Sequence, residues 1–292
     1  MFLARIVPFI GKLGRICRKK ATDLKAFSSP SAKLRCVLTI AGSDSSGGAG
    51  IQADLRTLAA LGVHGLSTIT AITAQNSKRV LSIHCVSSSH VRDQIEAVFE
   101  EFDVAAVKIG MLGSVGAIRV VAEILAKRAI KNIVLDPVLV SSSGAALLPR
   151  TAIKILRDRL IPLIEILTPN RPEAAALLGR TIAPEKAALA LLKLGTASVL
   201  LKGGHARGRS VVDHFVDANG SHHFSHERLP IRVRGTGCTL GSAIAANLAK
   251  GLSRLAAVRE AERFLQGALR RSQLASDSDS RVLLSSTISK KK

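Results

Sequence analysis

The segment Val233–Leu248 constrains the fold more than any other part of the chain. It reads VRGTGCTL followed by GSAIAANL. Glycine adopts positive φ and lets a ligand approach the backbone closely, and the proline-free run of small apolar residues predicts a helix. Free N–H groups at a helix start attract anions. The segment therefore predicts either a loop that holds a transferring phosphoryl group or a plain glycine turn before a buried helix.

Cys238 stands where this helix is expected to begin. At the positive end of a helix the pKa of a thiol falls, and the thiolate can then act as a base. The alternative is a buried cysteine without a chemical role, since cysteine is among the residues most often buried. The segment alone leaves both interpretations open.

The first predicted strand of the chain is also followed by a glycine-rich loop and a helix. Residues 36–41 read CVLTIA, which predicts a buried strand, and they lead into GSDSSGGAG at 42–50. Apolar residues then recur at helical spacing up to Leu61, and Gly62 ends the helix. A strand, a glycine-rich loop and a helix open many ligand-binding α/β folds. The loop matches neither GxxxxGK[ST] nor GxGxxG.

Strands and helices continue to alternate along the chain. Further strands are predicted at 66–72, 105–109, 132–136, 164–167 and 198–201, a hairpin at 211–216 and 221–224, and helices at 91–102, 115–128, 150–160, 173–178, 187–194 and 255–269. Such alternation predicts a three-layer α/β/α sandwich with a mostly parallel central sheet. Without a linker or a repeat, residues 36–271 are predicted to form one domain.

Polar residues follow several of the predicted strands, where ligands of open α/β sheets bind. Gln75 could read the edge of a heterocycle, Asp136 could hold Mg²⁺, and Lys202 suits an anionic ligand. Each also has a structural alternative: an exposed loop amide, a turn cap and a surface lysine. Glu173 opens a helix, where an acidic residue commonly complements the dipole.

Charge is unevenly distributed over the 292 residues, whose formal net charge is +21. Residues 1–35 contribute nine basic residues and one acid, and residues 268–292 contribute six and two, so more than half of the excess lies at the two ends. With 8 Phe and no Trp or Tyr, the chain lacks the stacking aromatics typical of nucleic-acid platforms. We expect no nucleic-acid partner and read the remaining surplus as solvated surface.

The two ends and the cysteines bear on location. The four cysteines are scattered, which argues against a zinc site or a disulfide framework and favours a reducing compartment. Residues 1–35 are basic and contain serines, as in an organellar transit peptide or a disordered basic extension. Charges interrupt their apolar run, so no membrane span is expected. A cytoplasmic protein is the first expectation and an organelle the alternative. Residues 272–292 are predicted to be a disordered tail.

Seven segments in order give the chain a resemblance to a known family. TIAGSDSSGGAGIQADLRTLAALG, TAITAQN, KIGML, VLDPV, LTPNRPEA, LLKGGH and RGTGCTLGSAIA resemble the hydroxymethylpyrimidine kinase/phosphomethylpyrimidine kinase family of thiamin biosynthesis, which has a ribokinase-like fold. The similarity spans about residues 36–270. It implies transfer of the ATP γ-phosphoryl group, with Mg²⁺, to a hydroxymethylpyrimidine and then to its monophosphate. A homodimer is the expected assembly.

The resemblance assigns roles residue by residue. The pyrimidine site would comprise Gly42, Asp54, Thr73, Gln75, Met111 and Val138. Asp136 and Glu173 would organise Mg²⁺, while Lys202, Asn170, Glu173 and Thr236 would contact ATP. Gly235, Thr236, Gly237 and Cys238 would form the anion hole, with Cys238 as the base.

The chain departs from the family pattern at several places. Arg234 replaces a histidine, Ser142 replaces a lysine, the connection after Leu178 is short, and the C-terminal signature is missing. Arg234 could still contact phosphate with different geometry. The alternatives are a pyridoxal-type kinase, against which TAQN and KIGML argue, and a catalytically weak pyrimidine-binding protein, against which Cys238, Lys202, Asp136 and Glu173 argue.

Overall fold

The structure is a computed structural model that describes residues 33–141, 144, 147–149, 151–204, 208–274 and 280–283. The chain divides after Leu34, and Arg35–Lys292 holds all helices and strands of the described residues. Most of the predicted basic extension, and Ser142, lie outside the described residues.

A nine-stranded sheet forms the centre, in the order β3-β2-β1-β4-β5-β6-β7-β8-β9. The strands are β1 (Cys36–Asp44), β2 (His64–Gln75), β3 (Val80–Cys85), β4 (Val104–Ile109), β5 (Ile133–Leu135), β6 (Ile166–Leu167), β7 (Ser198–Leu201), β8 (Ser210–Asp217) and β9 (Gly220–Glu227). The strands from β2 to β7 in this order are parallel, and β3, β8 and β9 are antiparallel to their neighbours. The predicted mostly parallel sheet is confirmed.

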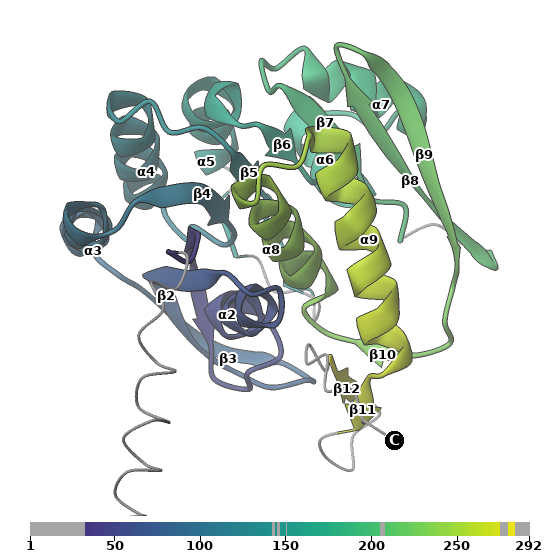
Figure 1. The fold of residues 1–292 in the computed structure, drawn as a ribbon, viewed down its shortest axis with the longest axis horizontal. Helices are drawn as coiled ribbons and strands as arrows, with labels where there is room; N and C mark the ends of the chain where they lie inside the picture. Colours follow the sequence, from purple (N-terminus) through teal and green to yellow (C-terminus); the bar gives the residue numbers. More distant parts are fainter. Residues whose placement is uncertain are drawn as a thin grey trace, which may run out of the picture. The chain divides into compact units, whose positions relative to one another are not determined.

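Helices cover both faces of the sheet (Figure 1). On one face lie α2 (Gly50–Ala60), α8 (Thr236–Ala249) and α9 (Arg254–Arg270), and on the other α3 (Ser88–Glu101), α4 (Val115–Lys127), α5 (Ala152–Ile155), α6 (Arg171–Leu178) and α7 (Pro184–Leu192). The apolar side chains of the sheet alternate between the two: Val37 packs with α8 and α9, whereas Leu38 and Ile40 pack with the opposite layer. Strands buried on both faces read as nearly continuous apolar runs.

The predicted helix at 150–160 is only partly correct. Four residues form α5, and the chain continues as a π-helical turn at Leu156–Leu160 and a 3₁₀ turn at Ile161–Leu163. Pro162 has no N–H and its ring crowds the carbonyl four residues earlier, so regular α-helical bonding cannot pass through it. The change of helix type fits this interruption.

The edge of the sheet near β2 differs from the prediction. β2 extends to Gln75, which was expected to lie in the loop beyond the strand, and the unpredicted β3 pairs antiparallel with it. β3 alternates apolar and polar residues from Leu81 to Cys85, a short strand signal that reasoning from the sequence missed, and the strand is largely exposed.

The segment predicted as a disordered tail contributes to a second sheet. Here β12 (Ser280–Val282) pairs with β10 (Arg232–Val233) and with β11 (Gln273–Leu274). Leu283 follows β12, is only 7% exposed and joins the core under α8 and α9. The prediction of disorder is therefore wrong for these residues, because one apolar anchor outweighs the polar composition around it.

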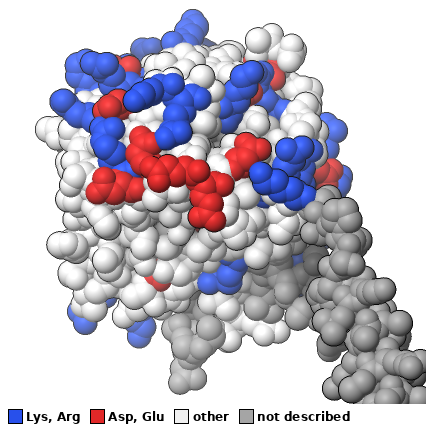
Figure 2. Space-filling view, turned by 60° about the vertical axis from the view of Figure 1, so that its left-hand side comes forward, with Lys and Arg blue, Asp and Glu red and all other residues white. Residues whose placement is uncertain are grey.

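The surface carries mixed charge on the face seen in Figure 2, where Asp and Glu side chains lie among Lys and Arg. Two ion pairs join α3 to α4 and to the residue that follows α4: Arg92 with Glu123 at 2.7 Å, and Glu96 with Arg128. This face is therefore not a continuous basic surface of the kind that follows a nucleic-acid backbone. Among the described residues, no helix is both long and apolar enough to cross a bilayer.

Candidate active site

The carboxyl ends of the parallel strands open into a cavity of about 700 Å³. Residues predicted from separate segments meet there. Its lining includes Gly42, Thr73, Gln75, Met111, Asp136, Val138, Asn170, Glu173, Lys202, Gly235, Thr236, Gly237 and Cys238. Asp54 is the one predicted site residue that does not line it. The topology explains this convergence, because parallel strands present their carboxyl ends at one edge.

The start of α8 forms one wall of the cavity. Gly235, the residue before the helix, has φ 74°, and a Cβ there would lie 2.1 Å from the carbonyl oxygen of Gly48. Only glycine fits this position. No side chain of the described residues caps the helix, so the first-turn N–H groups of Thr236, Gly237 and Cys238, which line the cavity, have no capping acceptor among them. That arrangement suits an anionic ligand.

An ion pair lies against this helix start. Lys202 Nζ donates to Asp136 Oδ1 at 2.6 Å, and a Cβ on Gly237 would come within 3.0 Å of Asp136 Oδ2. Burial lowers the pKa of Lys202, but Asp136 and Glu173 together raise the pKa above its ordinary value. Lys202 therefore stays an ammonium at neutral pH, beside the amides that would receive a phosphoryl group.

Glu173 begins α6 as part of a capping box. Its Oε2 accepts from Asn170 N at 2.8 Å, and Glu173 N donates to Asn170 Oδ1 at 2.9 Å. Glu173 therefore has the structural role at the helix start that its position suggested, and its side chain also lines the cavity. Burial, with the negative charge of Asp136, raises the pKa of Glu173 to about 7 against the opposing effect of Lys202. The acidic pair is short of positive charge, as expected where a cation binds.

Cys238 lies in the first turn of α8 and lines the cavity. Burial raises the pKa of its thiol to about 11, although Lys108 and the backbone amide of Gly50 lower it; Asp54 and Asp136 add to the rise. The expectation of a depressed thiol pKa is therefore wrong for the protein without ligands. The helix start supplies only partial positive charge, which does not offset removal of the thiolate from water.

Asp54 lies beneath the cavity in a buried polar cluster. Its carboxylate accepts from Thr39 Oγ1 at 2.7 Å, Lys108 Nζ at 2.8 Å and Ser242 Oγ at 2.9 Å. All four residues are 0% exposed. Asp54 does not line the cavity, and both of its carboxylate oxygens already accept hydrogen bonds from the protein. This structure therefore does not place it in direct contact with a pyrimidine in the cavity.

Lys108 was missed by reasoning from the sequence. It lines the cavity floor and holds Asp54, which raises the pKa of the ammonium despite the opposing effect of burial. The signal was a single lysine within the apolar strand segment VAAVKIG. A lysine in a strand that is buried on both faces needs a counter-charge.

The predicted pyrimidine side has a wall of small and apolar groups. A Cβ on Gly42 would lie 3.0 Å from Met111 Sδ, so glycine lets the thioether pack against the backbone. Thr73 Oγ1 donates to Ser43 O at 2.8 Å. Within the described part of the chain, the side-chain amide of Gln75 has no protein partner, which leaves its donor and acceptor to a ligand.

Arg234 ties the two glycine-rich loops together. Its Nη1 donates to Ser46 Oγ at 2.9 Å, and its Nη2 lies 3.5 Å from Asp44 Oδ2. Asp44 in turn accepts from the backbone N–H groups of Ser46 and Ala49, both at 2.8 Å. The guanidinium that was considered as a phosphate contact therefore binds the opposite loop in this structure.

Known proteins resemble this chain over most of its length. The family model of phosphomethylpyrimidine kinase matches residues 44–280. The hydroxymethylpyrimidine/phosphomethylpyrimidine kinase of Rhizobium meliloti is 47% identical over 238 residues, which cover 80% of this chain and 89% of that protein. This chain belongs to the phosphomethylpyrimidine kinase family.

Solved structures of related kinases share the fold. The phosphomethylpyrimidine kinase of Clostridium difficile is 43% identical, with a TM-score of 0.72, and the match covers 80% of this chain and 99% of that one. An ADP complex of Bacillus subtilis pyridoxal kinase has a TM-score of 0.79 at 31% identity, covering 86% and 97%. The architecture is thus common to both kinases, whereas sequence identity is higher to the pyrimidine kinases of the phosphomethylpyrimidine kinase family.

Proposed function

We propose that residues 36–271 catalyse transfer of the ATP γ-phosphoryl group to 4-amino-5-hydroxymethyl-2-methylpyrimidine, and then to the resulting monophosphate, in thiamin biosynthesis. The observation that carries this proposal is the meeting of the uncapped start of α8 with the Lys202–Asp136 pair and Cys238 in one cavity. Phosphoryl transfer requires mainly positioning and charge neutralisation, which amides and an ammonium supply.

The roles follow from position. Gln75, Gly42, Thr73, Met111 and Val138 would hold the pyrimidine. Lys202, Asn170 and Thr236 would contact ATP, and the amides of α8 would hold the transferring group. Cys238 would accept the proton of the alcohol. Because burial keeps the resting thiol protonated, Lys108 and the Gly50 amide are the groups that favour the thiolate as the reactants assemble.

Asp136 and Glu173 fit Mg²⁺. Both carboxylates are nearly buried at the cavity, and the pKa of Glu173 is raised beside Asp136, which indicates room for further positive charge. Mg²⁺ prefers oxygen ligands and usually keeps several waters when one or two carboxylates and substrate phosphates bind it. When bound, it neutralises charge on the phosphates.

The closest rival function is pyridoxal phosphorylation. A coupled assay with purified full chain, ATP and Mg²⁺ should compare hydroxymethylpyrimidine with pyridoxal, with products separated by mass. We expect the pyrimidine to gain one phosphate and then a second, with a higher kcat/KM than pyridoxal. Preference for pyridoxal would overturn the substrate assignment, and phosphorylation of neither would favour a catalytically weak binding protein.

Two further expectations belong to the proposal. A homodimer is supported by exposed apolar side chains at the β2–β3 edge, Ile72 at 53% and Leu81 at 61% exposure, because such patches often mark contacts between chains. Light scattering should give twice the chain mass, and Leu81→Lys should lower it. A cytoplasmic location is the first expectation, and residues 1–35 fused to a fluorescent protein test the organellar alternative.

A further inference from the structure

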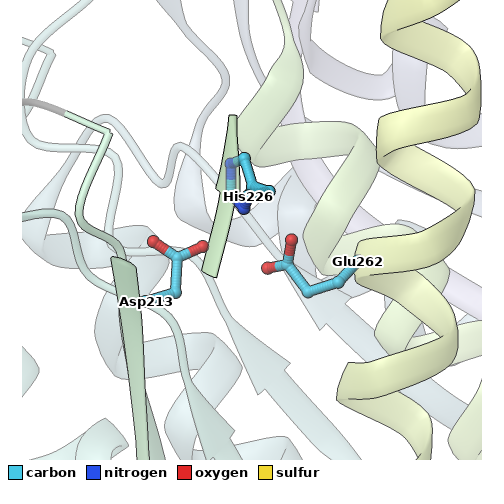
Figure 3. Close-up of side chains that lie close together, drawn as sticks. All are labelled: Asp213, His226 and Glu262. Atoms are coloured by element: carbon cyan, nitrogen blue, oxygen red, sulfur yellow. The ribbon is translucent and has the colours of Figure 1, made fainter. Parts of the chain in front are cut away.

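Three side chains outside the predicted site converge on one point. Asp213 of β8, His226 of β9 and Glu262 of α9 point toward one another (Figure 3). Their ligand-forming atoms all lie within 4.8 Å of one another. Asp213 is 4% exposed and Glu262 6%, and His226 is half-buried. A hairpin and a helix that are distant in sequence are thus joined by two carboxylates and an imidazole.

Glu262 lacks the partners that a buried carboxylate requires. Both of its oxygens are buried without a hydrogen-bond partner among the described residues. Asp213 Oδ1 accepts from Gly203 N at 2.5 Å, so its other oxygen remains for a ligand. An unpaired buried carboxylate costs several kcal/mol. Burial, the negative charge of Asp213 and, in the protonated form, a hydrogen bond to Asp213 raise the pKa of Glu262 to about 9, against the opposing effect of Lys202.

We propose that Asp213, His226 and Glu262 bind a divalent transition-metal ion of the zinc class, which clamps the β8–β9 hairpin onto α9. Zinc takes imidazole nitrogen at about 2.0–2.1 Å and carboxylate oxygen at about 2.0–2.2 Å. Magnesium and calcium favour oxygen alone. Two bonds of about 2.1 Å span at most about 4.2 Å, so a small side-chain rotation closes the site.

The site uses none of the residues assigned to the proposed kinase reaction, and the inference does not rest on that reaction. Asp213 and His226 line the same cavity as Lys202. A metal ion here therefore fixes the cavity wall formed by the edge hairpin. A proton shared between Glu262 and Asp213 is the competing explanation of the missing partner, and it predicts no metal binding.

Calorimetric titration of the chelator-treated full chain with ZnCl₂ tests the site. The Cys85→Ser background removes an exposed thiol that would also bind zinc. We expect one zinc ion that depends on the three residues, with MgCl₂ giving no comparable binding. His226→Gln and Glu262→Gln should each weaken zinc affinity by more than roughly 10–100-fold, which is the cost of losing a residue that is only hydrogen-bonded to a metal ligand. His222→Gln, which changes an exposed histidine four residues earlier in the same strand, should leave it unchanged.

Thermal melting gives a second readout that does not depend on activity. Zinc should raise the melting temperature of the parent chain and of His222→Gln, but not that of His226→Gln. His226 is only half-buried, so this variant remains informative if Glu262→Gln does not fold. Equal zinc affinity in the parent and in His226→Gln, or no zinc binding by the parent, would overturn the proposal.

Discussion

Two buried carboxylates on the same side of the sheet have opposite surroundings. Asp54 of α2 accepts hydrogen bonds from Thr39, Lys108 and Ser242, with an ammonium at 2.8 Å. Glu262 of α9 accepts none from the described residues and faces a second acid, Asp213. The first charge is neutralised within the protein, whereas the second requires something from outside.

The difference separates scaffold from binding site. A paired, hydrogen-bonded charge in a dry layer holds elements in place, and its removal exposes the partner to an uncompensated environment. A buried acid without a cationic partner, such as Glu262, has a raised pKa and takes up a proton on folding, at a cost that a bound cation can offset. The charges of Lys108 and Asp54 both act on the pKa of the nearby Cys238 thiol, which Lys108 lowers and Asp54 raises. The buried Asp54–Lys108 pair therefore also influences the electrostatics of the proposed reaction.

The largest expected effect is a loss of turnover in Cys238→Ala, a change next to the buried Asp54–Lys108 pair. Loss of a positioned base costs about 10²–10⁴-fold, and we expect kcat to fall by that factor. Pyrimidine affinity should change little, because the predicted binding groups stay in place. Steady-state kinetics and calorimetry of pyrimidine binding measure the two quantities. Unchanged turnover would remove Cys238 from the role of base.

The buried ion pair between Asp54 and Lys108 is removed by Asp54→Asn. This change leaves the Lys108 ammonium buried without its counter-charge, and breaking a buried pair costs about 3–5 kcal/mol. Urea unfolding should show that loss in the free energy of unfolding. In the double variant Asp54→Leu with Lys108→Met both charges are removed, and much of the stability should return. A loss below about 1 kcal/mol in Asp54→Asn would contradict the view that the pair holds α2 to the sheet.

Substitution of Glu262, which has no hydrogen-bond donor among the described residues, should change the free energy of unfolding in the opposite direction. In chelator-treated protein at neutral pH Glu262→Gln removes a buried acid that must be protonated in the folded state, because its pKa is raised to about 9, and we expect the free energy of unfolding to rise by about 1–3 kcal/mol. Saturating zinc should reverse the order, because only the parent gains metal binding. If Glu262→Gln destabilised the chelated chain as strongly as Asp54→Asn does, the comparison between the two carboxylates would fail.

The sequence was sufficient for the layers and for the convergence of nearly all predicted site residues on one cavity, because both depend on local patterns. Apolar runs ending in polar residues indicate parallel strands, and the topology then brings Gln75, Asp136 and Lys202 to one edge. The same reasoning could not pair Lys108 with Asp54, which is 54 residues away, since no local pattern links a strand lysine to a helix acid.

Other features depend on balances that residue types do not reveal. Asp213, His226 and Glu262 come from three elements, and only packing of α9 against the edge hairpin brings them together. The strands at 273–274 and 280–282 depend on the burial of Leu283. The thiol of Cys238 combines a helix start, a nearby ammonium and partial burial, and their net effect requires the geometry.

The smallest expected effect concerns that balance at Cys238. With burial raising the thiol pKa to about 11, only a small thiolate fraction exists at neutral pH, and it grows tenfold per pH unit below the pKa. The rate of Cys238 alkylation by iodoacetamide should therefore rise about tenfold per unit from pH 7 to pH 10. Mass spectrometry of the Cys238 peptide measures it, with the exposed Cys85 as an internal reference. Lys108→Met should slow the reaction further, because it removes the ammonium that favours the thiolate. A plateau near pH 7 would instead mean that the start of α8 outweighs burial and that the thiolate is present before any substrate binds.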